Sequence, residues 1–321
     1  MGIFANPLTD LLEYEDFSRD FLKGTDPVGM TGCIDSEKVH FISTFLGEKK
    51  VQLVVTYNEQ RAREIEEDYK LFCSQVYVIP PRDLIFFSAD LQGNAIIAER
   101  MKAFAALYQN EAKVIITTID ALMSAAVPFE QLMSHVIKLK EGDELDLEKL
   151  KHDLTVMGYE RVGRVEEPGQ FTVHGGIADV YPLTMDVPVR IELWGDEIDT
   201  IRCFEPQSQR SMDQIESVSV FPAAEVIADD TARRRAVGMI QNELESQLAV
   251  FKKVKEPDKA KRLREETNRI LEALGEEVVL EAPDSYISYF YPRTVRLSEY
   301  FDEKNTLVFL DEPMRLKERG D

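Results

Sequence analysis

The chain has 321 residues, of which 44% are hydrophobic and 30% are charged. This ordinary globular balance excludes a disordered, collagen-like or membrane-embedded chain, and the length is typical of two or three domains. The 38 basic residues against 59 acidic ones give a net charge of −21. Because DNA affinity comes largely from cations that displace counterions, so acidic a chain predicts little or no direct DNA binding and favours a protein partner.

Residues 1–126 alternate strand and helix signals. Short apolar runs rich in β-branched residues predict buried strands over 51–56, 76–79 and 114–118. Apolar side chains at helical spacing predict helices over 58–72, 97–108 and 119–126. Strand–helix alternation of this kind predicts a parallel sheet that is covered by helices on both faces.

Residues 127–218 follow a different pattern. A helix predicted over 147–157 precedes four strand-like segments separated by Gly or Pro, at 170–173, 177–181, 189–194 and 198–204. The sequence WGDE at 194–197 predicts a hairpin turn in which Gly195 supplies the positive φ. Short antiparallel strands without intervening helices predict a small separate α+β domain.

Residues 219–321 are first helical, over 231–254 and 258–274, and then apolar again at 306–310. This last run is expected to be one more strand of the first sheet, which would make the middle domain an insertion. The basic runs at 233–235 and 252–255 could form DNA-binding patches. Acidic residues share the first of these helices, so we expect both runs to be solvated faces.

The cysteines, Cys33, Cys73 and Cys203, are few and odd in number. Such usage argues against a disulfide framework and a zinc site, and it favours a reducing cytosol. The N-terminus lacks the features of a signal peptide, and no apolar run approaches the ~18 residues of a membrane span. We therefore expect a cytoplasmic protein without a metal, a cofactor or a membrane segment.

A phosphate-binding loop frame, Gly-x-x-x-x-Gly-Lys-Ser/Thr, is present but broken near the N-terminus. Gly29 and Ser36 fit the frame, and Gly32 adds a flexible position, but Ile34 replaces the second Gly and Asp35 replaces the Lys. A carboxylate there repels the phosphates, and a β-branched side chain resists positive φ. The sequence therefore predicts either a degenerate nucleotide site or a plain Gly-containing turn.

Two carboxylates, Asp311 and Glu312, directly follow the predicted strand at 306–310. The pair resembles the strand end that holds magnesium and the attacking water in P-loop ATPases, and it also fits an ordinary loop start. Both fragments of the nucleotide site belong at the carboxyl edge of one sheet. A carboxylate enzyme using this pair is a third reading, but no positioned His, Ser or Cys accompanies it.

Several segments of the middle domain resemble one known family. They are similar to domain 2 of the excision-repair protein UvrB and comprise 158–161 (GYER), 169–176 (GQFTVHGG), 179–182 (DVYP), 190–192 (RIE) and 195–202 (GDEIDTIR). The segments 99–100 (ER), 117–123, 208–211 (SQRS) and 311–315 (DEPMR) favour the N-terminal UvrB-homology module of bacterial transcription-repair coupling factors (Mfd). The resemblance covers essentially the whole chain.

The resemblance implies an α/β fold similar to UvrB domains 1a, 2 and 1b. A degenerate P-loop (RecA-like) parallel-sheet domain at 1–126 would carry an inserted small α+β domain at 127–218, followed by a helical segment and returning strand at 219–321. The function implied is a non-catalytic N-terminal fragment that recruits UvrA to stalled RNA polymerase. Its other partner would be the rest of an ATP-dependent DNA translocase, with the motor and the polymerase-binding domain. The alternative is a UvrB-like, ATP-using damage-binding protein.

The same resemblance implies UvrA contacts at Arg161, Phe171, Thr172, His174 and Ala178. Arg161 matches the family pattern and suits a planar, charge-paired contact. His174 stands where Arg is usual, and Ala178 stands where a bulkier apolar residue is common. Judged from its strand alone, Phe171 is more often a core residue than a contact.

Overall fold

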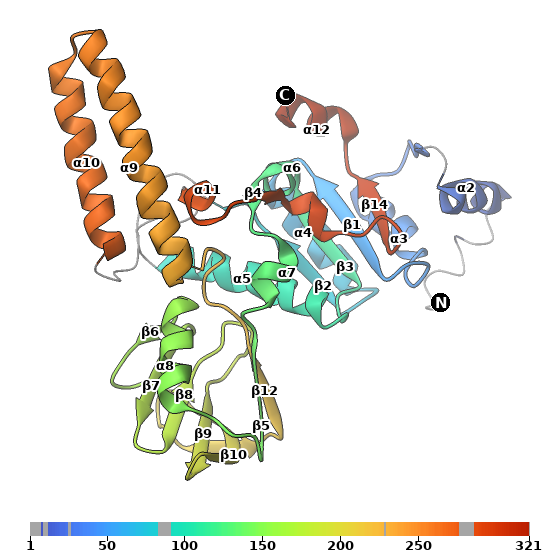
Figure 1. Cartoon of the computed structure of the whole chain (residues 1–321). Coiled ribbons are helices and arrows are strands. Elements are labelled where there is room, and N and C mark those ends of the chain that lie inside the picture. The colour runs from blue at the N-terminus through green and yellow to red at the C-terminus, as the bar shows by residue number, and fades with distance from the viewer. Residues whose placement is uncertain are drawn as a thin grey trace. The chain divides into compact units, whose positions relative to one another are not determined.

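The computed structural model describes residues 8, 12–24, 27–82, 91–227, 229–275 and 286–320. The chain divides into two compact units (Figure 1). Unit 1 comprises Met1–Arg82, Lys102–Ser124 and Arg296–Asp321, and unit 2 comprises Asp83–Met101 and Ala125–Val295. Unit 1 is thus assembled from three separate stretches of the chain, and most of unit 2 is an insertion into it.

A four-stranded parallel sheet forms the centre of unit 1, in the order β14–β1–β3–β2. Its strands are β1 (Val51–Thr56), β2 (Val76–Ile79), β3 (Val114–Thr118) and β14 (Thr306–Leu310). All three neighbouring pairs are parallel, and β14 pairs with β1 from Thr306 opposite Val51 to Leu310 opposite Val55. The predicted return of the C-terminal strand to the first sheet is confirmed.

In unit 1, α3 (Asp35–Ser43) precedes the first strand, and α4 (Glu59–Lys70), α6 (Ile119–Met123) and α12 (Pro313–Gly320) follow β1, β3 and β14. Ala62, Ile65 and Tyr69 of α4 are buried against the sheet. The side chain of Asn58 caps this helix by accepting a hydrogen bond from the amide of Arg61 at 2.8 Å. The third helix is shorter than the predicted 119–126, because 125–126 form the strand β4 (Ala125–Ala126).

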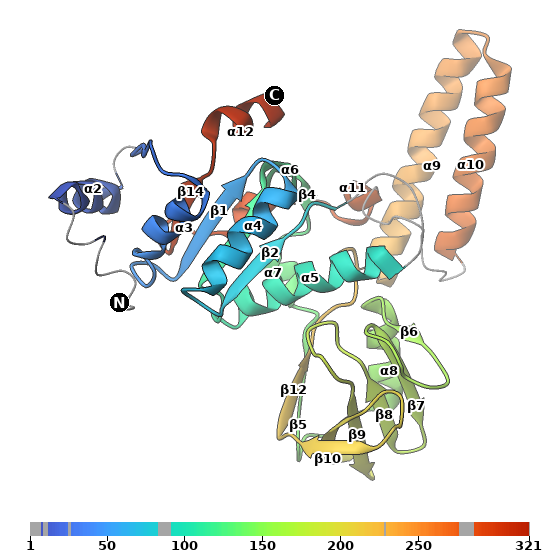
Figure 2. The same ribbon diagram turned by 180° about the vertical axis from the view of Figure 1, so that it is seen from behind.

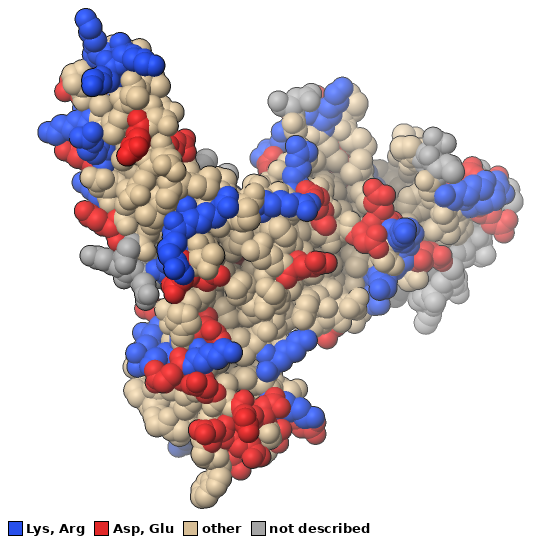
Figure 3. Space-filling view, viewed as in Figure 1, with Lys and Arg blue, Asp and Glu red and all other residues tan. Residues whose placement is uncertain are grey.

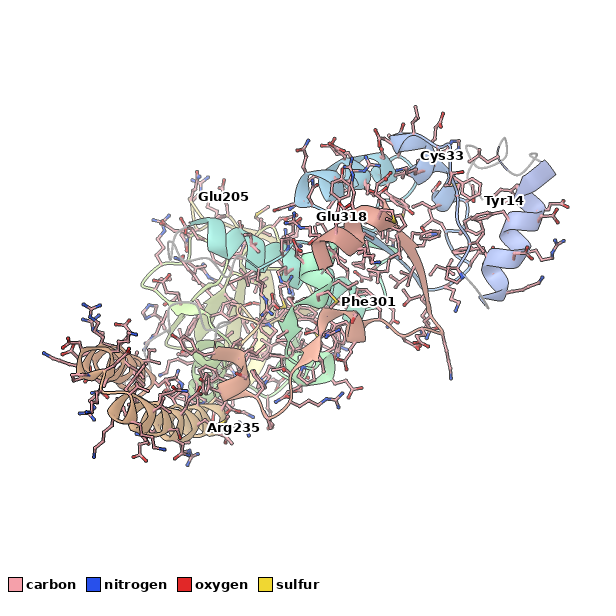
Figure 4. The ribbon with its side chains drawn as sticks, turned by 90° about the horizontal axis from the view of Figure 1, so that it is seen from above. Tyr14, Cys33, Glu205, Arg235, Phe301 and Glu318 are labelled. Carbon is pink, nitrogen blue, oxygen red and sulfur yellow. The ribbon has the colours of Figure 1, made fainter. Side chains whose placement is uncertain are left out.

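An aromatic cluster packs two helices of unit 1 together. Tyr14 of α2 (Leu12–Lys23), labelled in Figure 4, stacks on Phe45 with the ring centroids 5.9 Å apart. Phe17 meets Phe41 edge to face at 5.0 Å. This N-terminal helix was not predicted, although its aromatic residues recur at helical spacing.

A six-stranded sheet forms the body of unit 2, in the order β11–β10–β9–β8–β7–β6. Its strands are β6 (Glu160–Arg161), β7 (Gln170–His174), β8 (Ile177–Val180), β9 (Val189–Trp194), β10 (Glu197–Phe204) and β11 (Ser211–Gln214). All neighbours are antiparallel except β6, which runs parallel to β7. Gly195 joins β9 to β10 with φ +66°, so the predicted hairpin turn is confirmed.

One face of this sheet is covered by α8 (Leu147–Val156) and by the antiparallel pair β5 (Ile137–Lys140) and β12 (Ser217–Val220). The buried core includes Leu150 and Leu154 of the helix together with Ile191 and Ile201 of the sheet. Neither β5 (IKLK) nor β12 (SVSV) was predicted, because Lys or Ser alternates with the apolar residues and no apolar run results.

The remaining elements of unit 2 are mostly helical, with α5 (Leu91–Tyr108) crossing from unit 2 into unit 1. They include α7 (Phe129–Met133), α9 (Asp230–Lys253), α10 (Pro257–Gly275), α11 (Ile287–Phe290) and β13 (Val295–Arg296), followed in unit 1 by the 3₁₀ turn η2 (Leu297–Tyr300). The two long helices run side by side as an antiparallel hairpin (Figures 1 and 2). Both helices belong to unit 2, whereas the returning strand β14 belongs to unit 1. The predicted segment 219–321 is therefore divided between the two units. No helix in the described part of the chain is long and apolar enough to cross a membrane.

Candidate functional site

The broken loop frame leads into the N-terminus of α3 in unit 1, just after Cys33, which Figure 4 labels. Gly32 has φ +88°, and Ile34 is the extended N-cap residue with φ −91°. The amide of Ile34 donates a hydrogen bond to Oε2 of Glu37 at 3.2 Å, and Asp35 also lies in the first turn. This helix N-terminus, which favours an anion, therefore already carries carboxylates of the chain itself.

Asp311 is the centre of an ion cluster at the carboxyl edge of the sheet. Its Oδ1 lies 3.1 Å from Nζ of Lys38. Its Oδ2 accepts hydrogen bonds from Oγ1 of Thr56 at 3.0 Å and from Nε of Arg61 at 3.2 Å. The carboxylate is buried, with 6% of its side chain exposed. Two cations and a hydroxyl from three elements therefore fix its position.

Lys38 bridges both members of the acidic pair. Its Nζ lies 2.6 Å from Oε1 of Glu312, which adopts the left-handed φ of +53°. Burial acts to lower the pKa of Lys38, but hydrogen bonds to Glu312 and Asp311 oppose it, and the pKa is raised above its ordinary value. Lys38 is therefore a cation at neutral pH and compensates the two carboxylates.

Arg61 links the acidic pair to the loop frame. Its Nη2 lies 3.4 Å from Oδ1 of Asp35, while its Nη1 lies 3.1 Å from Oε2 of Glu64. The structure thus brings Asp35, Asp311 and Glu312 into one network, as their place at one sheet edge predicts. Gly29 and Ser36 are exposed beside it.

Sequence reasoning missed the cations Lys38 and Arg61. Lys38 could have been found from its position, because it lies on α3 three residues after Asp35, which replaces the Lys of the loop frame. Among the described residues, no group of three or more His, Cys, Asp or Glu is arranged to hold a metal ion.

The second candidate region is the six-stranded sheet of unit 2, where the resemblance places a partner contact. Phe171 and Ala178 are fully buried in its core, and Thr172 is only 7% exposed. Because successive side chains of a strand point to opposite faces, Phe171 and Ala178 point into the core that α8 covers. Their side chains offer no surface to a partner, which differs from the expectation that they make the contact.

Three exposed side chains lie at one end of the opposite, outer face of this sheet. His174 pairs with Ile177 across β7 and β8, and Ile177 pairs with Glu192, two residues before Trp194 on β9. Ile177 is 40% exposed and Trp194 is 83% exposed. We call His174, Ile177 and Trp194 the strand-end surface. Sequence reasoning missed Ile177 and Trp194. Because neighbouring residues of a strand point to opposite faces, a buried Ala178 places Ile177 on the outer face.

Arg161 lies at the edge of the same sheet. It is exposed on the two-residue strand β6, which pairs with β7 at Phe171. Arg161 shares the register position of the core residue Phe171, whereas His174 lies three residues further along β7 on the outer face, so Arg161 and the strand-end surface are two separate exposed parts of the domain. Arg161 is a local cation in an acidic domain, because residues 127–222 contain 9 basic and 19 acidic side chains, a net of −10. Figure 3 shows acidic side chains gathered where β5, β10 and β12 lie close together.

The rest of the outer face is occupied by contacts within the domain. Arg190 donates to both carboxylate oxygens of Asp179, at 2.8 and 2.7 Å. Its guanidinium also lies 4.8 Å from the ring centroid of Phe204. The hydrogen bonds to Asp179 raise the pKa of Arg190. This pair stiffens the sheet beside the strand-end surface.

Comparison with known proteins gives matches for both the domain and the chain. The family model described as UvrB interaction domain matches residues 137–225. The transcription-repair-coupling factor of Bacillus subtilis (strain 168) is 30% identical over 319 residues, which are 98% of this chain and 27% of that protein. That of Staphylococcus haemolyticus is 31% identical over 307 residues, 93% of this chain and 25% of that protein.

The chain therefore spans about a quarter of the length of the curated relatives it matches. The matched domain runs from β5 to just beyond β12, and so contains the whole six-stranded sheet with Arg161 and the strand-end surface. The chain is similar over nearly its whole length to the N-terminal quarter of transcription-repair-coupling factors, and its middle matches the UvrB interaction domain model.

Proposed function

We propose that this chain is a non-catalytic recruitment module that binds the excision-repair protein UvrA through residues 137–225. One observation carries the proposal: the matched UvrB interaction domain exposes the strand-end surface, with Trp194 83% exposed, and also exposes Arg161 on its edge strand β6. The similarity to coupling factors further suggests that the module acts in the cytoplasm, at stalled RNA polymerase, as part of an ATP-dependent DNA translocase.

The chemistry of the strand-end surface suits a protein partner. A Trp side chain that is 83% exposed on a rigid strand leaves a large apolar area uncovered. Trp and Arg are the residue types that most often dominate binding energy at interfaces. Phe171 and Ala178 then support the surface from behind by filling the core, while His174 and Ile177 complete its outer side.

We further propose that unit 1 is a RecA-like domain whose nucleotide site is degenerate. Lys38 and Arg61 occupy the carboxylates that would otherwise hold magnesium and water, and Asp35 and Glu37 occupy the helix N-terminus. A bound nucleotide would have to break these ion pairs and approach two carboxylates. This arrangement supports a binding module in preference to an ATP-using damage binder.

Binding to purified UvrA, measured by calorimetry, tests the recruitment proposal. We expect Arg161→Glu and Trp194→Ala each to weaken binding at least 30-fold, the equivalent of about 2 kcal/mol. Lys149→Glu is the matched control, because it makes the same charge change at an exposed position of α8, outside the strand-end surface, and should bind as the unmodified chain does. Unchanged affinity in the first two variants would show that the proposed surface is wrong.

Titration with magnesium-ATP tests the degenerate site separately. We expect no saturable binding in the micromolar range, and none in Asp35→Lys unless the internal cations are also removed. Saturable micromolar binding to the unmodified chain would contradict the proposal for unit 1, but it would not bear on the proposal that unit 2 binds UvrA.

A further inference from the structure

The far end of the α9–α10 hairpin gathers positive charge on a strongly acidic protein. Residues 248–264 contain seven Lys and Arg against two Asp and Glu, a net of +5, so the other residues together carry −26. Figure 3 shows blue side chains over this end of the hairpin. We call the seven the hairpin-tip cations: Lys252, Lys253, Lys255, Lys259, Lys261, Arg262 and Arg264.

The hairpin-tip cations are exposed and mostly free of carboxylate partners. All seven side chains are exposed. Lys259 pairs with Glu256 at 2.6 Å and Lys261 with Glu265 at 3.8 Å, both at the surface. In the described part of the chain, no ion pair engages the other five. Their charge is therefore available to a ligand.

Helix stability does not account for where these cations lie. Lys252 and Lys253 in the last turn of α9 oppose the negative end of the helix dipole, which is favourable. On α10, Lys259 lies in the first turn, next to the positive end of the dipole, which is unfavourable, while Lys261, Arg262 and Arg264 lie beyond the reach of the dipole. The dipole therefore does not explain the cations of α10, whereas a polyanionic ligand would.

The residue types favour phosphate over a protein partner. Five of the seven cations are Lys, a residue that is depleted at protein interfaces, where Arg and aromatic residues are enriched. The apolar side chains Leu248, Phe251 and Ala260 line the seam between the helices, a groove of ≈ 860 Å³. No aromatic side chain is exposed at the described hairpin tip, so it lacks the stacking platform that single strands require.

We propose that the hairpin tip binds the phosphate backbone of double-stranded DNA without reading its sequence. The net charge of −21 predicted little or no DNA binding because it sums the charge of the whole chain and does not show local clusters. Counterion release is local, and exposed charges are screened beyond about 8 Å at physiological salt. The 24 residues of α9 span about 36 Å, so the charges at the base of the hairpin lie several screening lengths from its tip.

Fluorescence anisotropy of a labelled 30-base-pair duplex, titrated with the full chain at several salt concentrations, tests this proposal. We expect dissociation constants within about 10⁻⁴–10⁻⁶ M at physiological salt. The triple variant Lys253→Gln, Lys259→Gln, Arg262→Gln should bind at least tenfold more weakly. Its log–log salt slope should be smaller by about 2.7, since each phosphate contact contributes about 0.9.

The matched control removes three exposed cations from unit 1: Lys50→Gln, Lys304→Gln and Lys317→Gln. It has the same net charge as the tip variant and should bind duplex as the unmodified chain does. Equal weakening in both variants would overturn the proposal, as would the absence of saturable binding. Displacement of the duplex by polyglutamate at equal charge concentration would also overturn it, in favour of an acidic protein. Circular dichroism of both variants verifies that the helices remain folded.

Discussion

Lys38 and Asp311 stand 273 residues apart in the chain, yet Nζ of the first lies 3.1 Å from Oδ1 of the second. The contact joins α3 to the residue that follows β14, and it closes unit 1 around the insertion. The ion pair therefore links two distant segments of the chain within unit 1.

Replacing Lys38 by Met should destabilise the protein. Asp311 is buried and would keep only Arg61 as a charged partner, while Glu312 would lose its partner at 2.6 Å. Removing one partner of a buried pair costs about 3–5 kcal/mol, and we expect roughly half of this because Lys38 is a quarter exposed and Arg61 remains. Urea denaturation measures the change in the free energy of unfolding.

Lys70→Met is the control for this experiment. It removes a cation whose pair with Glu66 is at the surface, and such pairs contribute about 0–1 kcal/mol. If the two variants lose the same stability, the Asp311 cluster has no special role in closing unit 1.

The buried pair of Arg100 and Glu225 makes a second stability prediction, in unit 2. Nη2 of Arg100 donates to Oε2 of Glu225 at 3.0 Å, Nε donates to Oε1, and the two side chains are 0% and 4% exposed. Arg100→Leu should cost about 3–5 kcal/mol because Glu225 is left buried without its guanidinium. The double variant Arg100→Met, Glu225→Leu should recover most of this loss.

Thermal or urea unfolding of the single and double variants decides this prediction. Arg269→Leu is the control, because its pair with Glu266 is exposed and contributes within about 1 kcal/mol. A double variant no more stable than Arg100→Leu would mean that packing, and not the stranded carboxylate, accounts for the loss.

Tyr291 predicts how stability falls in alkaline solution. Its hydroxyl accepts from the amide of Ile227 at 2.9 Å and donates to the carbonyl of Ile227 at 3.1 Å. Burial raises the pKa of Tyr291 to about 12, above the ordinary value near 10. A raised pKa in the fold means that the contribution is complete below pH ~10 and is lost as the pH rises from about 10 to 12.

A shift of two pKa units corresponds to roughly 2–3 kcal/mol. Between about pH 10 and 12, the free energy of unfolding of the unmodified chain should therefore fall by about that much more than that of Tyr291→Phe. At neutral pH, Tyr291→Phe should itself cost about 1–3 kcal/mol, because the polar backbone groups of Ile227 lose their partner. Urea denaturation at pH 7, 10 and 11.5 checks both. Parallel pH curves for the two proteins would exclude the role given to this hydroxyl.

The elements that sequence patterns predicted were those with strong periodicity. The strands at 51–56 and 114–118 are rich in β-branched apolar residues, and Gly195 at its turn has a positive φ, so each was found at its place. Strands β5 (IKLK) and β12 (SVSV) were missed because polar residues alternate with the apolar ones, so neither forms an apolar run. Which residues of β7 and β8 face outward could have been read from alternation, but the resemblance pointed to Phe171 and Ala178, which the fold buries. The cations that meet Asp311 lie too far away in sequence to be predicted.

Trp194 offers a direct probe of the proposed partner surface, because it is the only tryptophan of the chain and is 83% exposed. Labelling with 5-fluorotryptophan should give a single fluorine resonance at the chemical shift of a solvated indole. Addition of unlabelled UvrA should shift and broaden it, since the ring would leave water. Arg161→Glu should suppress this change, and Lys149→Glu should preserve it. A resonance that stays fixed while calorimetry reports binding would place UvrA elsewhere on the domain, because an indole inside an interface cannot keep its solvent environment.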